Sequence, residues 1–137
     1  MVHVESPTTT TTRAVVSAAY AAAGNSDMAA ILEILDPDVV LHEPASLPNA
    51  GVHRGLQNVL RALAYVFEDF DMSRLTVDEL IVDGERAVGL VNLTLRGREI
   101  QSSVAEVWRV RGGRVVEIRP YYFDTAAILG PIIWSWR

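Results

Sequence analysis

The sequence predicts an α+β fold, a curved antiparallel sheet whose concave face is partly closed by three N-terminal helices. Two observations predict it. Apolar residues recur at helical spacing in three segments of the first half of the chain, and they alternate with polar residues in four segments after residue 75. Helices followed by a run of consecutive strands are typical of α+β domains, and this arrangement leaves a pocket between the sheet and the helices.

The helices are predicted from their apolar stripes and their end signals. The first is the alanine-rich segment 13–23, which Thr12 is placed to cap. The second follows Asp27, a good N-cap, and ends before Pro37. The third, 55–67, has the most regular stripe. Its apolar positions are Leu56, Val59, Leu60, Leu63, Val66, Phe67 and Phe70.

The strands are predicted from period-two alternation and from the turn residues between them. An early strand covers 39–43. The later four are 76–82, 87–95, 100–111 and 115–123. The Asp-Gly pair at 83–84 is a strong hairpin signal, and a Gly-Gly pair at 112–113 separates the last two strands. Asp124 is expected to cap a short helical turn through Leu129.

Length and composition indicate a single domain, 13–137, preceded by a disordered tail, 1–12. The chain carries 12 basic and 17 acidic residues, a formal net charge of −5, and no basic stripe, so nucleic acid is not an expected partner. No apolar run approaches the roughly 20 residues that span a bilayer, so no membrane contact is expected. The absence of cysteine excludes disulfides and thiolate metal sites and fits a reducing cytoplasm. Three histidines without ligand spacing predict no metal site.

Two glutamates fall on strand faces that are otherwise apolar. Glu106 shares its face with Val104 and Trp108, and Glu43 shares its face with Leu41, because side chains two residues apart point to the same side of a strand. Burial of an ionised carboxylate is costly, so such a group raises its pKa or finds a partner. The two together indicate a cavity with acid–base chemistry. A position at the open rim of the sheet, or an ion pair with a nearby arginine, is the alternative interpretation for each.

The order of these elements and several short motifs resemble the nuclear transport factor 2-like superfamily. Within it, the chain is most similar to SnoaL-like polyketide cyclases and to ketosteroid isomerase. The motifs are 20–23, 25–27, 38–44, 51–55, 106–110, 113–117 and 119–124. The resemblance implies a cone-shaped, cystatin-like fold, in a superfamily that includes cyclases, isomerases, hydrolases, dehydratases and non-enzymatic binders.

The resemblance to ketosteroid isomerase assigns roles to both glutamates. Glu43, before Pro44, occupies the position of the isomerase's general base. Glu106 occupies the position of its second carboxylic acid, which stays protonated in an apolar site and donates a hydrogen bond. The isomerase's third group, a tyrosine of the first helix, corresponds to Ala19, one residue before Tyr20.

These roles predict an isomerase or cyclase that acts next to a carbonyl on a polyketide- or steroid-like substrate and needs no cofactor. Glu43 removes a carbon-bound proton, and Glu106 donates a hydrogen bond to the developing enolate. An epoxide hydrolase, or an epoxide-opening cyclase of a polyether-type pathway, is an alternative, although Tyr121 stands where the hydrolase triad has its last Asp. A ligand-binding module without chemistry is a further alternative.

Several other residues are candidates for contact with a hydrophobic small-molecule substrate. They are Tyr20, His42, His53, Trp108, Tyr121 and Tyr122. His42 alternates with Glu43 and is therefore expected on the opposite face of its strand. As in the superfamily, a homodimer through the outer sheet face is expected, with the apolar segment 132–136 available for the seam.

Overall fold

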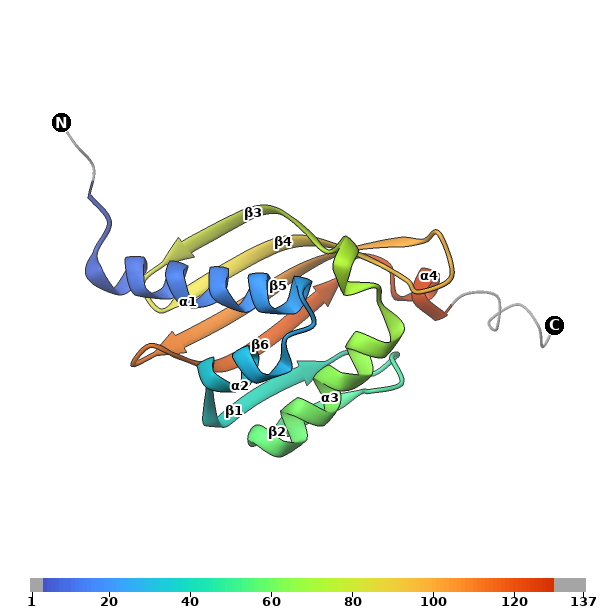
Figure 1. Ribbon diagram of the computed structural model, residues 1–137, viewed down its shortest axis with the longest axis horizontal. Coiled ribbons are helices and arrows are strands. Elements are labelled where there is room, and N and C mark those ends of the chain that lie inside the picture. The colour runs from blue at the N-terminus through green and yellow to red at the C-terminus, as the bar shows by residue number, and fades with distance from the viewer. Residues whose placement is uncertain (1–3, 130–137) are drawn as a thin grey trace.

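A computed structural model describes residues 4–129, which form one six-stranded, curved sheet with helices on one face (Figure 1). The strand order is β2-β1-β6-β5-β4-β3. The strands are β1 (Leu35–Glu43), β2 (Gly51–Arg54), β3 (Thr76–Asp83), β4 (Arg86–Thr94), β5 (Gln101–Arg111) and β6 (Arg114–Tyr122). The expected antiparallel meander is confirmed for β3 to β6.

The first three helices lie in front of the sheet in Figure 1 and cover its concave face, and the short fourth helix lies at the right-hand end of the molecule. They are α1 (Pro7–Gly24), α2 (Met28–Ile34), α3 (Leu56–Asp69) and α4 (Thr125–Leu129), with a single 3₁₀ turn, Met72–Arg74, after α3. Helix α1 crosses strands β3 to β6, whereas α3 lies against β1 and β2. As expected, the Asp27 side chain caps α2 and the Asp124 side chain caps α4.

Three features of the sheet differ from the sequence prediction. Strand β2 is not among the predicted strands; it has only four residues and lies beside turn-forming residues. Strand β1 pairs with β6 in parallel, and not antiparallel, since no hairpin joins these two strands and fixes their direction. Strand β1 also begins at Leu35, earlier than expected, with a register shift between Leu35 and Val40 that accommodates Pro37.

The expected disordered tail through Thr12 is wrong for residues 7–12, which form the first turns of α1. Ser6 caps the helix by accepting a hydrogen bond from the Thr9 N–H, and Pro7 occupies the first turn, where a missing N–H costs nothing. Thr12, expected to be the cap, is 1% exposed within the helix.

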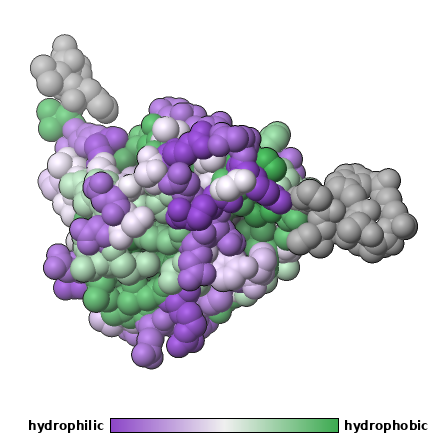
Figure 2. All heavy atoms as spheres, turned by 45° about the vertical axis from the view of Figure 1, so that its right-hand side comes forward, coloured by the Kyte–Doolittle hydropathy of each residue, from purple (hydrophilic) through white to green (hydrophobic). Residues whose placement is uncertain are grey.

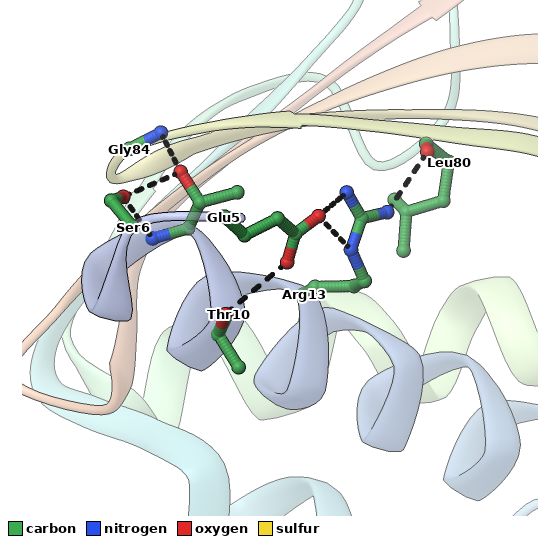
Figure 3. Close-up of polar contacts among 7 residues, drawn as sticks. Glu5, Ser6, Thr10, Arg13, Leu80 and Gly84 are labelled. Carbon is green, nitrogen blue, oxygen red and sulfur yellow. Dashed lines mark hydrogen bonds and ion pairs between the residues drawn. The ribbon is translucent and has the colours of Figure 1, made fainter. Parts of the chain in front are cut away.

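Side-chain contacts fasten this helix start to the β3–β4 hairpin (Figure 3). The Gly84 N–H donates to Thr9 Oγ1 over 2.9 Å, and the Arg13 guanidinium pairs with Glu5 and reaches the Leu80 carbonyl. These contacts anchor the helix that carries Tyr20.

The core lies between the concave face of the sheet and helices α1 to α3. On β5 the predicted alternation is confirmed, because Ser102, Val104, Trp108 and Val110 are buried and Glu106 lies on the same face. Helix α1 contributes buried apolar side chains, and so do β1 and α3. They are Val16, Ala19, Leu35, Val39, Leu41, Val59 and Ala62.

The surface of the described residues mixes apolar and hydrophilic side chains, and Figure 2 shows green apolar surface bordered by purple hydrophilic residues on one side of the molecule. Within the described residues, no helix is long and apolar enough to cross a membrane. The segment 132–136, expected to contribute to a dimer seam, lies outside the described residues.

Candidate functional site

A cavity of about 70 Å³ lies between the concave face of the sheet and helices α1 to α3. Most of its lining is apolar, and the described lining residues include no arginine, lysine or histidine. The residues with polar atoms in this lining are Tyr20, Glu43, Glu106, Trp108 and Tyr122. The cavity therefore presents acidic and hydroxyl groups to a ligand in an otherwise apolar environment.

The sheet brings the two glutamates to opposite sides of one strand. Glu106 of β5 pairs with Pro120 of β6, while Leu41 of β1 pairs in parallel with Ile118. Two residues further along β1, Glu43 comes beside Pro120 on its other side. Because neighbouring strands lie about 4.8 Å apart and the sheet curves toward the helices, both carboxyl groups face the same cavity. The predicted pairing of these residues at one cavity is therefore what the fold produces.

Tyr20 connects helix α1 to β5 through a chain of two hydrogen bonds. The Trp108 indole N–H donates to the Tyr20 hydroxyl oxygen over 2.9 Å, and the Tyr20 hydroxyl donates to Glu106 Oε1 over 2.8 Å. The two aromatic rings pack edge to face with their centroids 5.4 Å apart. The chain orients the Glu106 carboxyl group and supplies a hydrogen bond that favours its ionised form.

Gly89 makes room for this contact. It lies opposite Glu106 in the β4–β5 register, and a Cβ atom at this position would come within 2.0 Å of the Tyr20 hydroxyl oxygen. Any larger residue here would displace the Tyr20 ring. The absence of a side chain at residue 89 is thus part of the site.

Glu43 is 8% exposed, and its Oε2 atom has no hydrogen-bond partner among the described residues. Burial raises the pKa of Glu43 to about 7, and the negative charge of Glu106 adds to this increase. The side chain of Asn49 partly offsets the increase by hydrogen bonding. A buried carboxyl oxygen without a donor is most stable when the group is protonated.

Burial likewise raises the pKa of Glu106 to about 7, and the hydrogen bond from Tyr20 opposes this rise. Two phenols share the environment. Burial, followed by the charge of Glu106, raises the pKa of Tyr20, and burial together with the charges of Glu43 and Glu106 raises the pKa of Tyr122. Both tyrosines therefore remain protonated at neutral and moderately alkaline pH, and their hydroxyl groups can donate hydrogen bonds.

Three of the predicted contact residues do not line this cavity. His42 lies on the opposite face of β1, where its Nε2 is 2.9 Å from Glu117 Oε2, as its alternation with Glu43 predicts. His53 is held near the Asn49 carbonyl oxygen, with Nε2 2.7 Å from it. Tyr121 is 55% exposed on the outer side of β6. Tyr20, Trp108 and Tyr122 do line the cavity.

The sequence prediction did not include Gly89 and Asn49. Gly89 had a usable signal, since a glycine inside a strand pattern often marks a close approach of another group. Asn49 lies in a turn-forming stretch and had no such signal. Among the described residues, no group of three or more His, Asp or Glu side chains is placed to hold a metal ion.

Comparison with known proteins identifies the family. The model of the SnoaL-like domain matches residues 16–118. The chain belongs to the SnoaL-like domain family. The matched range contains α2, α3, most of the sheet and both glutamates, and it ends before Pro120 and Tyr122.

Solved structures with the nuclear transport factor 2-like fold are similar to this SnoaL-like domain over most of its length. One is a protein of unknown function from Burkholderia pseudomallei K96243, 28% identical, with a TM-score of 0.74 over 87% of this chain and 95% of that one. Another is a proposed ketosteroid isomerase from Kribbella flavida DSM 17836, 23% identical, with a TM-score of 0.73 over 85% of this chain and 80% of that one. A proposed SnoaL-like polyketide cyclase from Jannaschia sp. CCS1 is 19% identical, with a TM-score of 0.76 over 93% of this chain and 95% of that one. The predicted family and fold are thereby confirmed.

Proposed function

We propose that this SnoaL-like protein is a small-molecule acid–base enzyme that transfers a proton next to a carbonyl group. The observation that carries the proposal is the pair of cavity carboxyl groups, each with a pKa raised to about 7. Glu106 receives a hydrogen bond from Tyr20, and the Oε2 atom of Glu43 has no partner among the described residues. General acids and bases work best when their pKa lies near the working pH.

The hydrogen bonds favour a division of roles opposite to the one that the resemblance to ketosteroid isomerase implies. Tyr20 donates to Glu106, which stabilises the carboxylate, so we assign Glu106 as the general base. Glu43 has no donor to Oε2, and ionised Glu106 raises its pKa further, so we assign Glu43 as the protonated acid. A pair of interacting carboxyl groups that shares one proton near neutral pH fits both assignments.

The reaction then consists of two proton transfers. Glu106 accepts a proton from the carbon next to the substrate carbonyl, while Glu43 donates a hydrogen bond or its proton to the carbonyl oxygen as negative charge develops there. In an isomerisation, Glu106 returns its proton to a different carbon and Glu43 recovers any proton it gave to the oxygen. In a ring closure, the enolate carbon attacks a second carbonyl, whose oxygen takes the proton held by Glu106 as the first carbonyl re-forms and Glu43 recovers its proton. Tyr122 lies close enough to both carboxyl groups for their charges to raise its pKa, so its hydroxyl is available to the same oxygen.

The lining favours a largely apolar substrate without anionic groups, because anionic groups would meet acidic side chains with no basic side chain among the described lining residues. A volume of about 70 Å³ suits a compact molecule, or the reactive end of a larger polyketide- or steroid-like one. An epoxide could accept the Glu43 proton in the same way. Tyr121, at the position of the hydrolase's last Asp, lies outside the cavity and supplies no third group for the hydrolase triad.

The test is exchange of deuterium from solvent into the positions next to the carbonyl of cyclopentanone and cyclohexenone. We expect catalysed exchange that falls by about 100-fold or more in Glu106→Gln and in Glu43→Gln, because each removes a proton-transfer group. Glu68→Gln, on the exposed side of α3, is the matched control and should retain full activity. Exchange that persists in both cavity variants would contradict the proposal, and no exchange with any ketone would favour a ligand-binding module.

We further propose a homodimer through the outer face of the sheet and, from the cysteine-free sequence, a cytoplasmic location. An apolar row crosses that face, because Ile81 pairs with Val88 and Val88 pairs with Val107 on neighbouring strands. Tyr121 lies exposed on the same face. Val107→Glu should yield a monomer in analytical ultracentrifugation, and a wild-type protein that is monomeric at all concentrations would contradict the dimer.

A further inference from the structure

We propose that the cavity also binds small hydrophobic amines in their ammonium form, with the nitrogen between Glu43 and Glu106 and the hydrocarbon part against the apolar lining. This binding uses the same cavity as the proposed reaction but requires no catalysis, so either proposal can fail alone.

The charge of the cavity is the first observation. Glu43 and Glu106 face the same enclosed space from strands on either side of β6, and none of the described lining residues is basic. When both carboxyl groups ionise, two negative charges face each other without a countercharge from the lining. An ammonium ion supplies that charge, and close opposite charges attract strongly where water is excluded.

The second observation is the Oε2 atom of Glu43, which is buried, belongs to a side chain that is 8% exposed, and has no partner among the described residues. Buried polar atoms in proteins are nearly always hydrogen-bonded, so an exception calls for an explanation. The N–H groups of an ammonium ion are donors without any acceptor requirement, and they match an ionised carboxylate that lacks a donor.

The walls around the two carboxyl groups suit the hydrocarbon part of such a ligand. Trp108 and Tyr122 provide aromatic surface on the sheet side, and Phe67 provides it on the helix side. Aromatic faces attract organic cations in addition to binding their apolar groups. The small volume of the cavity favours a compact monoamine over a long polyamine.

Amine binding should depend on pH in the direction set by the carboxyl groups. The charged or titratable groups near the site are Glu43 on β1, Glu106 on β5, Tyr122 on β6, Tyr20 on α1 and Asp69 on α3, whose charge acts on Tyr122. Helix α2 contributes only apolar residues to the lining. Both tyrosines stay protonated, so the two glutamates control the response, and raising the pH through about 7 ionises them and strengthens binding of the cation.

The experiment compares three molecules of similar shape, cyclopentylamine, cyclopentanol and cyclopentanecarboxylate, with the full chain in calorimetric titrations at about pH 6 and about pH 8. We expect the amine to bind about tenfold more tightly than the alcohol at the higher pH, and to weaken at the lower pH. The carboxylate should not bind. Carboxyl-detected NMR of the wild type should show both glutamates titrating at lower pH when the amine is bound.

Each outcome decides the proposal. Equal or tighter binding of the alcohol at the higher pH overturns it, and so does amine binding that survives in the Glu43→Gln/Glu106→Gln double variant. Loss of amine binding in that variant, with binding retained in Glu68→Gln, supports it. If cyclopentylamine does not bind while ketone deuteration proceeds, the amine proposal is wrong and the proposed enzymatic function stands.

Discussion

At the scale of single residues, Tyr20 has one hydroxyl proton, and the fold directs it to Glu106 and not to a ligand. The same oxygen accepts the Trp108 indole N–H, so the phenol is bonded on both sides. The Tyr20 hydroxyl therefore stabilises the charge of Glu106, and its proton is not available to a substrate in this arrangement.

Replacing Tyr20 by Phe should raise the pKa of Glu106 further, because the hydrogen bond that favours its carboxylate is lost. The Trp108 N–H also loses its acceptor, so the free energy of unfolding should fall by about 1–3 kcal/mol. Carboxyl-detected NMR and urea unfolding measure the two effects. Tyr65→Phe, at an exposed position on α3, is the control. An unchanged Glu106 titration in Tyr20→Phe would contradict the hydrogen-bond chain.

Gly89→Ala should disrupt the same contact from the other side. The added methyl group would lie 2.0 Å from the Tyr20 hydroxyl oxygen, so the ring must move, at a cost of about 1–3 kcal/mol in unfolding free energy and with loss of ketone deuteration. Gly24→Ala is a suitable control, because the nearest atom to its added methyl group is 4.0 Å away. Wild-type stability and activity in Gly89→Ala would show that Tyr20 does not need this space.

The sequence predicted the two glutamates because period-two alternation is a local signal that survives in the folded sheet. The position of Tyr20 could not be predicted in the same way. It depends on how α1 is rotated against the sheet and on the space at Gly89, which lies on a strand far from Tyr20 in the sequence. A glycine inside a strand pattern signals that some group approaches closely, but it does not identify Tyr20 as that group.

At the scale of elements, the C-terminal end of α3 positions one wall of the cavity. Arg96, in the turn after β4, donates from its guanidinium to the carbonyl oxygens of Phe67, Glu68 and Phe70. These carbonyls at the helix end lack partners within the helix, and a cation there satisfies them and complements the helix dipole. Because Phe67 lines the cavity, Arg96 fixes part of the binding surface from outside.

Arg96→Gln should lower the free energy of unfolding by about 1–2 kcal/mol and weaken ligand binding, since the helix end loses its donors. Arg61→Gln is the matched control, because Arg61 is exposed on α3 and the one hydrogen bond of its guanidinium among the described residues goes to the Asn58 side chain. Chemical denaturation and calorimetry check both effects. Equal stability of the two variants would contradict the role of Arg96.

The elements themselves were largely predictable, and the errors have physical causes. The composition of residues 1–12 predicts a tail, yet Thr9 and Thr12 make contacts with the rest of the fold that stabilise the helix. Strand β2 is too short for an alternation to be visible, and it exists because β1 offers it a free edge.

At the scale of the whole molecule, the two cavity glutamates make folding stability depend on pH. In the folded state burial raises the pKa of each to about 7 from an ordinary value of 4.5, so the folded protein binds more protons than the unfolded chain between these values. The free energy of unfolding that this extra proton binding contributes is fully present below about pH 4.5 and is lost as the pH rises through 7.

The free energy of unfolding should therefore decrease between about pH 5 and pH 8, by at most about 1.4 kcal/mol per pH unit for each group. Urea unfolding measured across this range gives the slope. In Glu43→Gln/Glu106→Gln the slope should largely disappear, since neither side chain then titrates. Glu68→Gln should keep the wild-type slope. A wild-type stability that rises over this interval would be opposite in sign to the expectation.

The central claim is that Glu43 and Glu106 share one desolvated cavity and interact there. The measurement that tests it most directly is a pH titration of both carboxyl groups by ¹³C NMR, in the wild type and in Glu106→Gln. We predict that both groups titrate near pH 7 in the wild type and that removal of the Glu106 charge lowers the pKa of Glu43. Two independent titrations near the ordinary value of 4.5 would contradict the claim and the proposed chemistry with it.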